Sequence, residues 1–216
     1  MKKISKIFKR KNIGSMGIGA MIIFIAMVLV AGIAASVLVQ VANTLQMQAL
    51  YTGHETIEEV ATGVAVLDVE GHVTGSVIDK LVIGVRGRAG SGDIDLSQLV
   101  IEIADTQNKM VLIYNESQHQ TSPSNSGVFN TSVFNLSGIN FGILVLEDAD
   151  GSCGTAATPI INKGDYVMLT INTTATFGGL QARMDIWGNV IPEIGSWGII
   201  SFRTPPTFTD EVYDLQ

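Results

Sequence analysis

The residues best placed for metal chemistry lie in one acidic turn. Asp148 and Asp150 precede Gly151 in a D-x-D-G pattern, which gathers oxygen ligands of the kind that Ca²⁺ and similar hard cations prefer. The distal glutamate that completes an EF-hand loop does not follow at the required spacing. We therefore favour a plain acidic turn and keep a structural Ca²⁺ or similar cation at Asp148 and Asp150 as the alternative. No other cofactor is expected.

Catalytic chemistry has little support in the chain. The three histidines, His54, His72 and His119, are scattered and show no HExxH or related spacing. The single cysteine, Cys153, stands in a Gly-Ser-Cys-Gly sequence, and no base accompanies it at a recognisable spacing. A P-loop motif is also missing from the sequence. The sequence thus predicts a protein that is not an enzyme.

Asparagine side chains offer a site of modification instead. Four Asn-x-Ser/Thr sequons begin at Asn115, Asn130, Asn135 and Asn172, and this sequence is the acceptor of N-glycosylation in exported proteins. The first three fall within residues 115–140, a segment rich in Ser, Asn and Thr that predicts one or two long exposed loops. We expect an N-linked glycan on at least one of the four.

These candidates must be carried by two different parts of the chain, and the first is an apolar helix. No Lys, Arg, Asp or Glu occurs between Asn12 and Gly53, and residues 18–42 would span roughly 37 Å as a helix. A bilayer core needs only about 30 Å, whereas a secretory signal has an apolar region of about 7 to 15 residues. We expect a retained helix from about Ser15 to about Thr62, with Gly63 as its C-terminal cap.

Basic residues fix the orientation of this helix in a membrane. Six of the first eleven residues are basic, and the next basic residue is Lys80. The six are Lys2, Lys3, Lys6, Lys9, Arg10 and Lys11. By the positive-inside rule, the N-terminus lies in the cytoplasm and the rest of the protein lies outside the cell.

The net charge is distributed unevenly along the chain. It is −7 overall, but removing the basic leader lowers the Lys and Arg count from 13 to 7 against 20 Asp and Glu, which leaves −13. An exported part this acidic will not bind nucleic acid, because non-specific binding needs a basic surface. One cysteine allows no internal disulfide, so packing, assembly or glycans must stabilise the protein.

Beyond Gly63, short β-branched runs broken by Gly, Asn, Asp and Ser predict about eight strands. They cover residues 64–69, 77–85, 99–104, 110–114, 143–147, 166–171, 183–187 and 198–202. This spacing indicates an antiparallel Ig-like sandwich or barrel. Trp187, Trp197 and Phe202 fall in strand-like segments, and we expect them in the core or at a subunit interface. The expected fold class is α+β, a long hydrophobic N-terminal helix followed by an all-β head.

Small residues within the apolar helix would let copies of it pack together. Ala31 with Ala35, and Gly32 with Ser36, form small-xxx-small pairs that permit close approach of two helices. Transfer of an apolar helix from lipid into a bundle is roughly neutral in hydrophobic free energy, so close packing must favour the bundle. The alternative is ordinary variety in a membrane anchor.

The N-terminal residues resemble those of a known family. A short basic leader, a junction of small residues and an uninterrupted apolar helix are similar to a class III, prepilin-type signal peptide. Residues 22–31 and 34–38 closely resemble the N-terminal helix of archaeal flagellins, the archaellins, and the segments at 188–193 and 204–216 are also archaellin-like. The resemblance covers about the first fifty residues and the end of the chain.

This resemblance implies a cleavage site. A membrane aspartyl prepilin peptidase would cut after Gly14, which makes Ser15 the new N-terminus and leaves Gly17 two residues beyond it. Archaellin leaders usually have Lys or Arg directly before that glycine, whereas Asn12 and Ile13 intervene here. A cut after Gly17 is therefore kept as the rival.

The resemblance also implies a function. The protein would be a structural subunit of the archaellum, the rotating filament of archaeal swimming. Residues 1–14 would be the cleaved signal peptide, residues 15–62 a helix that is transmembrane before assembly and lies in the filament core afterwards, and residues 63–216 the glycosylated outer domain. Its partners would be copies of itself or other archaellins, the prepilin-type peptidase, and the assembly and motor machinery in the membrane. The filament would be extracellular and the precursor would be inserted in the cytoplasmic membrane.

Two alternatives stay open. The first is a non-motile, type IV-like adhesion pilin, which is disfavoured because Gly19 stands where many pilins carry Glu as the fifth mature residue. The second is a membrane-anchored solute-binding or enzymatic domain that never polymerises.

Overall fold

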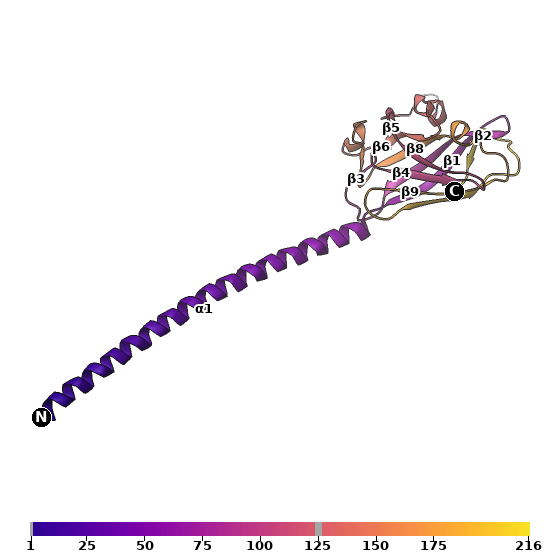
Figure 1. Cartoon of the computed structure of the whole chain (residues 1–216). Coiled ribbons are helices and arrows are strands. Elements are labelled where there is room, and N and C mark those ends of the chain that lie inside the picture. Colours follow the sequence, from indigo (N-terminus) through magenta and orange to yellow (C-terminus); the bar gives the residue numbers. More distant parts are fainter. Residues whose placement is uncertain (1, 124–126) are drawn as a thin grey trace. The chain divides into compact units, whose positions relative to one another are not determined.

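The computed structural model describes residues 2–123 and 127–216, with the side chains of residues 2–13 and 15 outside that description. The chain divides into two units, Met1–His54 and Glu55–Gln216. The first consists of helix, and the second contains the last helical turns followed by the β head (Figure 1).

Helix α1 extends over Lys2–Ala61, so in the full-length chain the helical backbone includes the leader. Its end agrees with the expected one to within a residue, because the amide of Thr62 still donates to the Glu58 carbonyl at 2.8 Å. Gly63 was expected to cap the helix, and this prediction is wrong. Gly63 instead forms a parallel bridge with Ser196, where an added Cβ would lie 2.8 Å from the Ser196 side chain. Close approach of two backbones explains the glycine.

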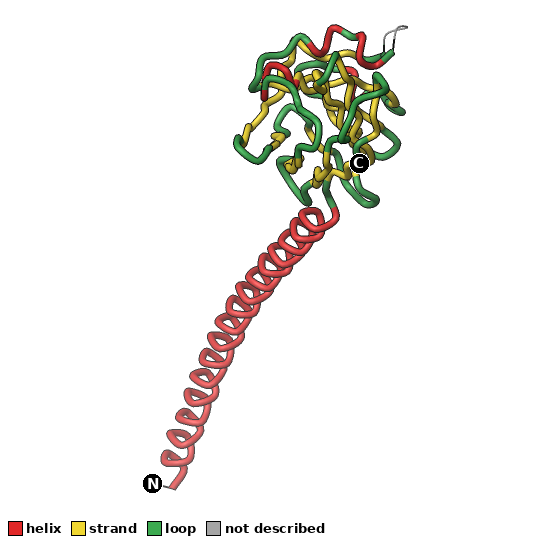
Figure 2. The backbone as a smooth tube through the Cα atoms, turned by 90° about the vertical axis from the view of Figure 1, so that its right-hand side faces the viewer, coloured by secondary structure: helices red, strands yellow, loops and turns green. Residues whose placement is uncertain are grey.

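Among the described residues, nine strands form one sheet and two short strands form a second. Figure 2 shows the strands gathered in the head. The order in the large sheet is β10-β9-β4-β5-β6-β8-β2-β1-β11, and β3 pairs with β7. The strands are β1 (Val64–Thr74), β2 (Val77–Gly87), β3 (Ile94–Asp95), β4 (Val100–Ala104), β5 (Lys109–Gln120), β6 (Asn140–Glu147), β7 (Ile160–Ile161), β8 (Tyr166–Asn172), β9 (Asp185–Ile191), β10 (Gly198–Arg203) and β11 (Val212–Asp214). The remaining helical segments are α2 (Thr173–Phe177) and the 3-10 helices Val128–Asn130, Ser132–Phe134 and Ser152–Gly154. A long apolar helix followed by a large β-sheet domain is the expected fold class.

One strand pair departs from the expected antiparallel order. Strand β5 runs parallel to β6, and their register shifts between Tyr114 and His119. The residues between those two therefore form a bulge in β5, which extends six residues past the predicted end at Tyr114. Parallel neighbours need a long connection, and the segment between Gln120 and Asn140 provides it.

The large sheet curls so that its two ends approach each other. The amide of Val64 at the start of β1 donates to the Ser196 carbonyl just before β10, at 3.2 Å. The C-terminal residue closes the gap further along, because the amide of Val69 donates to the Gln216 carbonyl at 3.3 Å. The Gln216 side chain in turn accepts from the Ser201 amide at 2.7 Å and donates to the Ile199 carbonyl at 3.1 Å. The curled sheet encloses the main core.

The segment predicted as a long exposed loop is a cover for the sheet. Phe129, Val133 and Phe134 are buried, and they form a second apolar cluster with Val82, Leu144 and Met168 on β2, β6 and β8. Alternation of residues 77–85, with Ile78, Lys80 and Val82 on one side, indicated a strand with one face in water, but Val82 is buried by this cover. These strands are apolar on both faces because both faces are covered.

Candidate functional site

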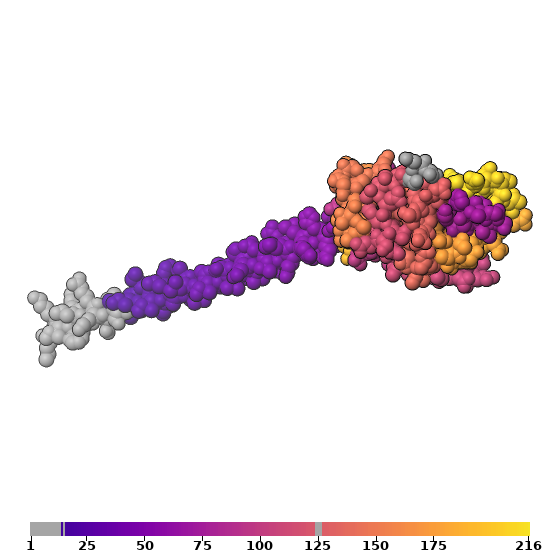
Figure 3. Space-filling view, turned by 90° about the horizontal axis from the view of Figure 1, so that it is seen from above, coloured from indigo at the N-terminus to yellow at the C-terminus, as the bar shows by residue number. Residues whose placement is uncertain are grey.

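The apolar part of α1 is the first candidate site, because the large apolar side chains described there are exposed. Met16 is 75% exposed, Phe24 68% and Leu38 70%, and the space-filling view shows the described surface of this helix open to solvent (Figure 3). Among the described residues, one helix, Met16–Ala61, is long and apolar enough to cross a membrane. Such a surface is stable in lipid or against other apolar helices.

Small side chains form a shallow depression on this helix. It is lined by Ile23, Ala26, Met27, Val30, Ala31 and Ala34. Of the four residues predicted to permit close helix packing, Ala31 lies in the depression, and Gly32, Ala35 and Ser36 are exposed on the same helix. Ala26 and Ala34 were not singled out, although their spacing along one helix face would have allowed it. The depression can receive a side chain of a neighbouring helix.

The predicted processing junction lies on exposed helical backbone. Gly14 and Gly17 are exposed, and a Cβ added at either position would meet nothing within 4 Å. Ser15 lies within the helix, with its side chain outside the described residues. The backbone at this junction is therefore approachable once the helix is locally unwound.

The four sequons differ in accessibility. Asn130 and Asn135 are exposed, in or beside the 3-10 helices that cover the sheet. Asn115 is half-buried in the bulge of β5, where its side-chain oxygen accepts from the Ser117 amide at 3.1 Å. Exposed positions on a folded surface suit an oligosaccharide best, so Asn130 and Asn135 are the favoured acceptors.

Asn172 has a structural role that conflicts with modification. Its side-chain oxygen accepts from the Ala175 amide at 3.1 Å, which caps the N-terminus of α2. Its side-chain NH₂ donates to the Phe134 carbonyl at 3.2 Å. A glycan on that nitrogen would disrupt the contact with the covering segment, so we place Asn172 last among the four.

We expect Asn172→Gln to lower stability without changing the glycan mass. Loss of an N-cap costs about 1 kcal/mol, so the thermal midpoint of the full-length chain should fall. The exposed Asn135 offers the matched control, since Asn135→Gln should lower the glycan mass and leave the midpoint unchanged. Intact-mass spectrometry and thermal unfolding of the two variants measure both effects. A loss of glycan mass in Asn172→Gln would contradict this assignment.

The acidic turn is tied together by hydrogen bonds. Asp148 accepts from the Gly151 amide at 2.8 Å. Asp150 accepts from the Ser152 amide at 3.0 Å and from the Asn162 side chain at 2.7 Å. The pKa of Asp150 is lowered, first by the Ser152 side chain, then by the Asn162 side chain and the Ser152 amide. Both carboxylates therefore shape the turn through these hydrogen bonds.

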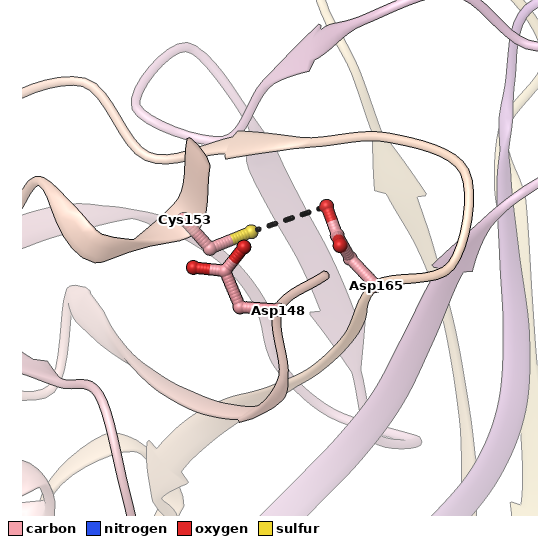
Figure 4. Close-up of side chains that lie close together, drawn as sticks. All are labelled: Asp148, Cys153 and Asp165. Carbon is pink, nitrogen blue, oxygen red and sulfur yellow. Dashed lines mark hydrogen bonds between the residues drawn. The ribbon is translucent and has the colours of Figure 1, made fainter. Parts of the chain in front are cut away.

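A buried carboxylate and the cysteine lie beside Asp148 (Figure 4). One ligand atom each from Asp148, Cys153 and Asp165 lies within 4.8 Å of the others. Asp165 is fully buried and accepts from the Ala149 amide at 3.1 Å and the Asn162 amide at 2.9 Å. Asp165 was missed because it is far from the D-x-D-G pattern in the sequence.

The thiol and the histidines support no catalytic role. Burial, and next the charge of Asp165, raise the pKa of the Cys153 thiol to about 12, so it stays protonated and is a poor nucleophile. His72 pairs with Asp79 at 2.7 Å, and His119 contacts the Cys153 carbonyl at 2.9 Å. His72 and His119 therefore make contacts within the head, and His54 is exposed on α1.

A β head that follows a fully exposed apolar helix defines a class of protein. Such a helix must lie in a membrane or be covered by further copies, as in subunits of pilin-like filaments. Comparison with known proteins then gives the particular family. Residues 14–202 match the model of archaeal-type flagellin, and the chain belongs to this family.

Relatives match along almost the whole chain. Flagellin B2 of Methanocaldococcus jannaschii is 47% identical, over 99% of this chain and 100% of the relative. Flagellin B1 of Methanococcus voltae is 39% identical, over 98% of this chain and 99% of the relative. Both matches cover nearly the whole chain, so the predicted membership of the archaellin family is confirmed.

Solved structures show the same fold. The crystal structure of archaeal flagellin FlaB1 from Methanocaldococcus jannaschii matches with a TM-score of 0.65 and 31% identity, over 72% of this chain and 98% of that one. The archaeal flagellum of Methanospirillum hungatei strain JF1 matches with a TM-score of 0.59, over 92% of this chain and 98% of that one, at 15% identity. The latter likeness establishes the fold alone.

Proposed function

We propose that the protein is a structural subunit of the archaellum, which polymerises into an extracellular filament that rotates for swimming. The observation that carries this proposal is the exposed apolar surface of α1 in a chain of the archaeal-type flagellin family. Copies of the helix would line the filament core, and residues 63–216 would form the outside. Torque and ATP hydrolysis would come from the membrane-bound motor machinery.

The subunit reaches the filament through a membrane precursor. The helix first spans the cytoplasmic membrane, with residues 1–14 as its cytoplasmic leader, and a prepilin-type peptidase then cuts between Gly14 and Ser15. The family match beginning at residue 14 supports this boundary. Cleavage removes the six basic residues that anchor the precursor in the membrane, and the helix of residues 15–62 can then move from lipid into the bundle.

Deletion of the coding sequence tests this function. We expect the deletion strain to lose surface filaments and swimming, while adhesion to surfaces is retained. Re-expression of the wild-type chain should restore both filaments and swimming. Swimming cells that have lost adhesion would instead identify an adhesion pilin, and a monomer that stays in membranes with its leader attached would identify a non-polymerising anchor.

We further propose that Asp148 and Asp150 contribute to a site for Ca²⁺ or a similar hard cation. The buried carboxylate of Asp165 close to Asp148 supports this, because two neighbouring carboxylates with no basic side chain within ion-pair distance among the described residues favour a cation. The Cys153 thiol is an unsuitable ligand for a hard cation, so oxygen atoms would hold it.

Chelation tests the cation proposal. A cation that binds only the folded head adds stability by mass action, so EDTA should lower the thermal midpoint of isolated filaments and Ca²⁺ should restore it. Asp148→Asn should abolish the response to EDTA, whereas Asp210→Asn, on an exposed turn, should preserve it. An unchanged wild-type midpoint in EDTA would contradict the site.

A further inference from the structure

One face of the head, formed by the adjacent strands β10, β9, β4 and β5, exposes large apolar side chains. Ile199 on β10 is 65% exposed, Trp187 on β9 is 49% exposed and Ile113 on β5 is 53% exposed. Trp197, directly before β10, is 55% exposed. Both tryptophans of the chain are therefore in contact with solvent on this side. We call the outward side of β10, β9, β4 and β5 the tryptophan face.

The strand register makes this face continuous. Ile199 lies opposite Asn189 on β9, which lies opposite Glu102 on β4, and Glu102 lies opposite Val111 on β5. The next outward row passes through Val100 on β4 and Ile113 on β5. Nine large apolar side chains are exposed among the described residues beyond α1. Four of them, Val111, Ile113, Trp187 and Ile199, lie on these strands, and Trp197 directly precedes β10. Concentration of exposed apolar surface on one side is typical of a protein interface.

The charges on the tryptophan face cancel, in contrast to the rest of the head. Lys109 pairs with Glu102 at 2.9 Å, and Arg203 with Asp185 at 3.4 Å. All 20 acidic residues of the chain follow His54, against 7 basic residues, so the head carries a net charge of −13. Two such heads repel each other at most orientations. On the tryptophan face these charges are paired. A contact through this face therefore brings no unpaired charge from it against the neighbouring head.

The tryptophan face borders a hollow that is also lined by the last turns of α1. Trp197 and Ile194 line a hollow together with Glu55, Glu58 and Glu59, which lie on the last turns of α1. The last turns of α1, which belong to the same unit as the head, therefore border the tryptophan face. Tryptophan is enriched in the energetically important centres of protein interfaces.

We propose that the tryptophan face contacts the head of a second copy of this chain in the filament. The contact rests on the proposed filament function and adds to it a lateral interface outside the helical core. The second copy would present a different surface, because a contact between two identical faces closes a dimer, whereas contacts between different faces continue a helical polymer.

The two native tryptophans report on this contact directly. We expect acrylamide to quench tryptophan fluorescence several-fold less in sheared wild-type filaments than in the full-length precursor dispersed in detergent. Both tryptophans lie on the proposed interface, so the difference measures its burial. Equal quenching in the two states would overturn the proposal.

A matched pair of substitutions provides the second test. Ile199→Lys places a charge in the proposed interface, and we expect a several-fold loss of surface filaments. Val212→Lys makes the same change at a residue that is 46% exposed on β11, where it lies opposite His72 on β1, and we expect filaments at the wild-type level. Normal assembly of Ile199→Lys, or equal loss in both variants, would overturn the proposal.

Two controls separate folding and function from the interface. The Ile199→Lys precursor should accumulate in membranes and resist limited proteolysis as the wild type does, which shows a folded head. If the wild-type chain formed no filament, the proposed filament function would be contradicted. If wild-type filaments formed and the Ile199→Lys variant assembled equally well, only the proposed interface would be contradicted.

Discussion

Gly14→Val should leave the precursor uncleaved, and cells that carry it should make no filament. Glycine lets a peptidase approach the backbone closely, whereas a β-branched side chain at the cut blocks that approach. The retained leader keeps six basic residues in front of the apolar helix. Each would cost about 2.5–3.5 kcal/mol if drawn into an apolar environment, so the uncleaved helix cannot enter a bundle.

The matched control for this variant is Gly19→Val. Gly19 lies in the same helix, a Cβ there also meets nothing within 4 Å, and it is outside the predicted cleavage site. We expect normal cleavage and normal filaments in this control. Immunoblots of membranes and sheared filaments distinguish the longer precursor from the mature chain. A mature chain that begins at Ser15 in Gly14→Val cells would contradict the assignment, and a start at Ile18 in the wild type would support the rival cut after Gly17.

Ala31→Leu should block assembly while leaving membrane insertion intact. The variant helix is more apolar than the original, so it should enter the membrane at least as well. Ala31 lies in the shallow depression on α1, and a larger side chain there would overpack a close helix contact at a cost of about 1–3 kcal/mol. Because every copy carries the change, filament yield should fall about tenfold or more.

Ala42→Leu provides a control of equal added volume. Ala42 is exposed on the same helix and lies outside the depression, so this variant should assemble at the wild-type level. The amounts of protein in sheared filaments and in membranes measure both variants. Assembly of Ala31→Leu at the wild-type level would show that this part of the helix makes no close contact in the filament.

The strands of the head were largely predictable because their apolar runs are clear. Each of the eight predicted runs overlaps a strand of the large sheet. Strands β3, β7 and β11 were missed because they have two or three residues, too few to show a pattern. The sheet order was also out of reach, since pairing such as that of β4 with β9 joins residues far apart in the sequence.

Burial of the polar segment 115–140 was misjudged for a related reason. The composition of this segment predicted an exposed loop, but three of its own residues, Phe129, Val133 and Phe134, are buried against the sheet. Three apolar residues among many polar ones are enough to hold the segment against the sheet, because strands β2, β6 and β8 present apolar side chains on that side. Local composition cannot show that a distant strand needs a cover.

The candidate sites also differ in whether they depend on local sequence or on contacts between distant residues. Sequence motifs alone predict the junction at Gly14 and the four sequons, because these signals are local, and the junction stays a prediction. The capping role of Asn172 depends on Phe134, and the surroundings of Asp148 depend on Asp165. Trp187 and Trp197 were expected either in the core or at a subunit interface, and their exposure favours the interface. Such distinctions need the folded arrangement.

Mass spectrometry of filaments sheared from cells tests the central claim most directly. If α1 is released from its leader to assemble with other copies, the main filament protein should be this chain with Ser15 as its first residue. Its peptides should also carry glycan mass at Asn130 or Asn135. Absence of the chain from filaments, together with full-length chain in the membrane that still begins with the leader, would contradict the account.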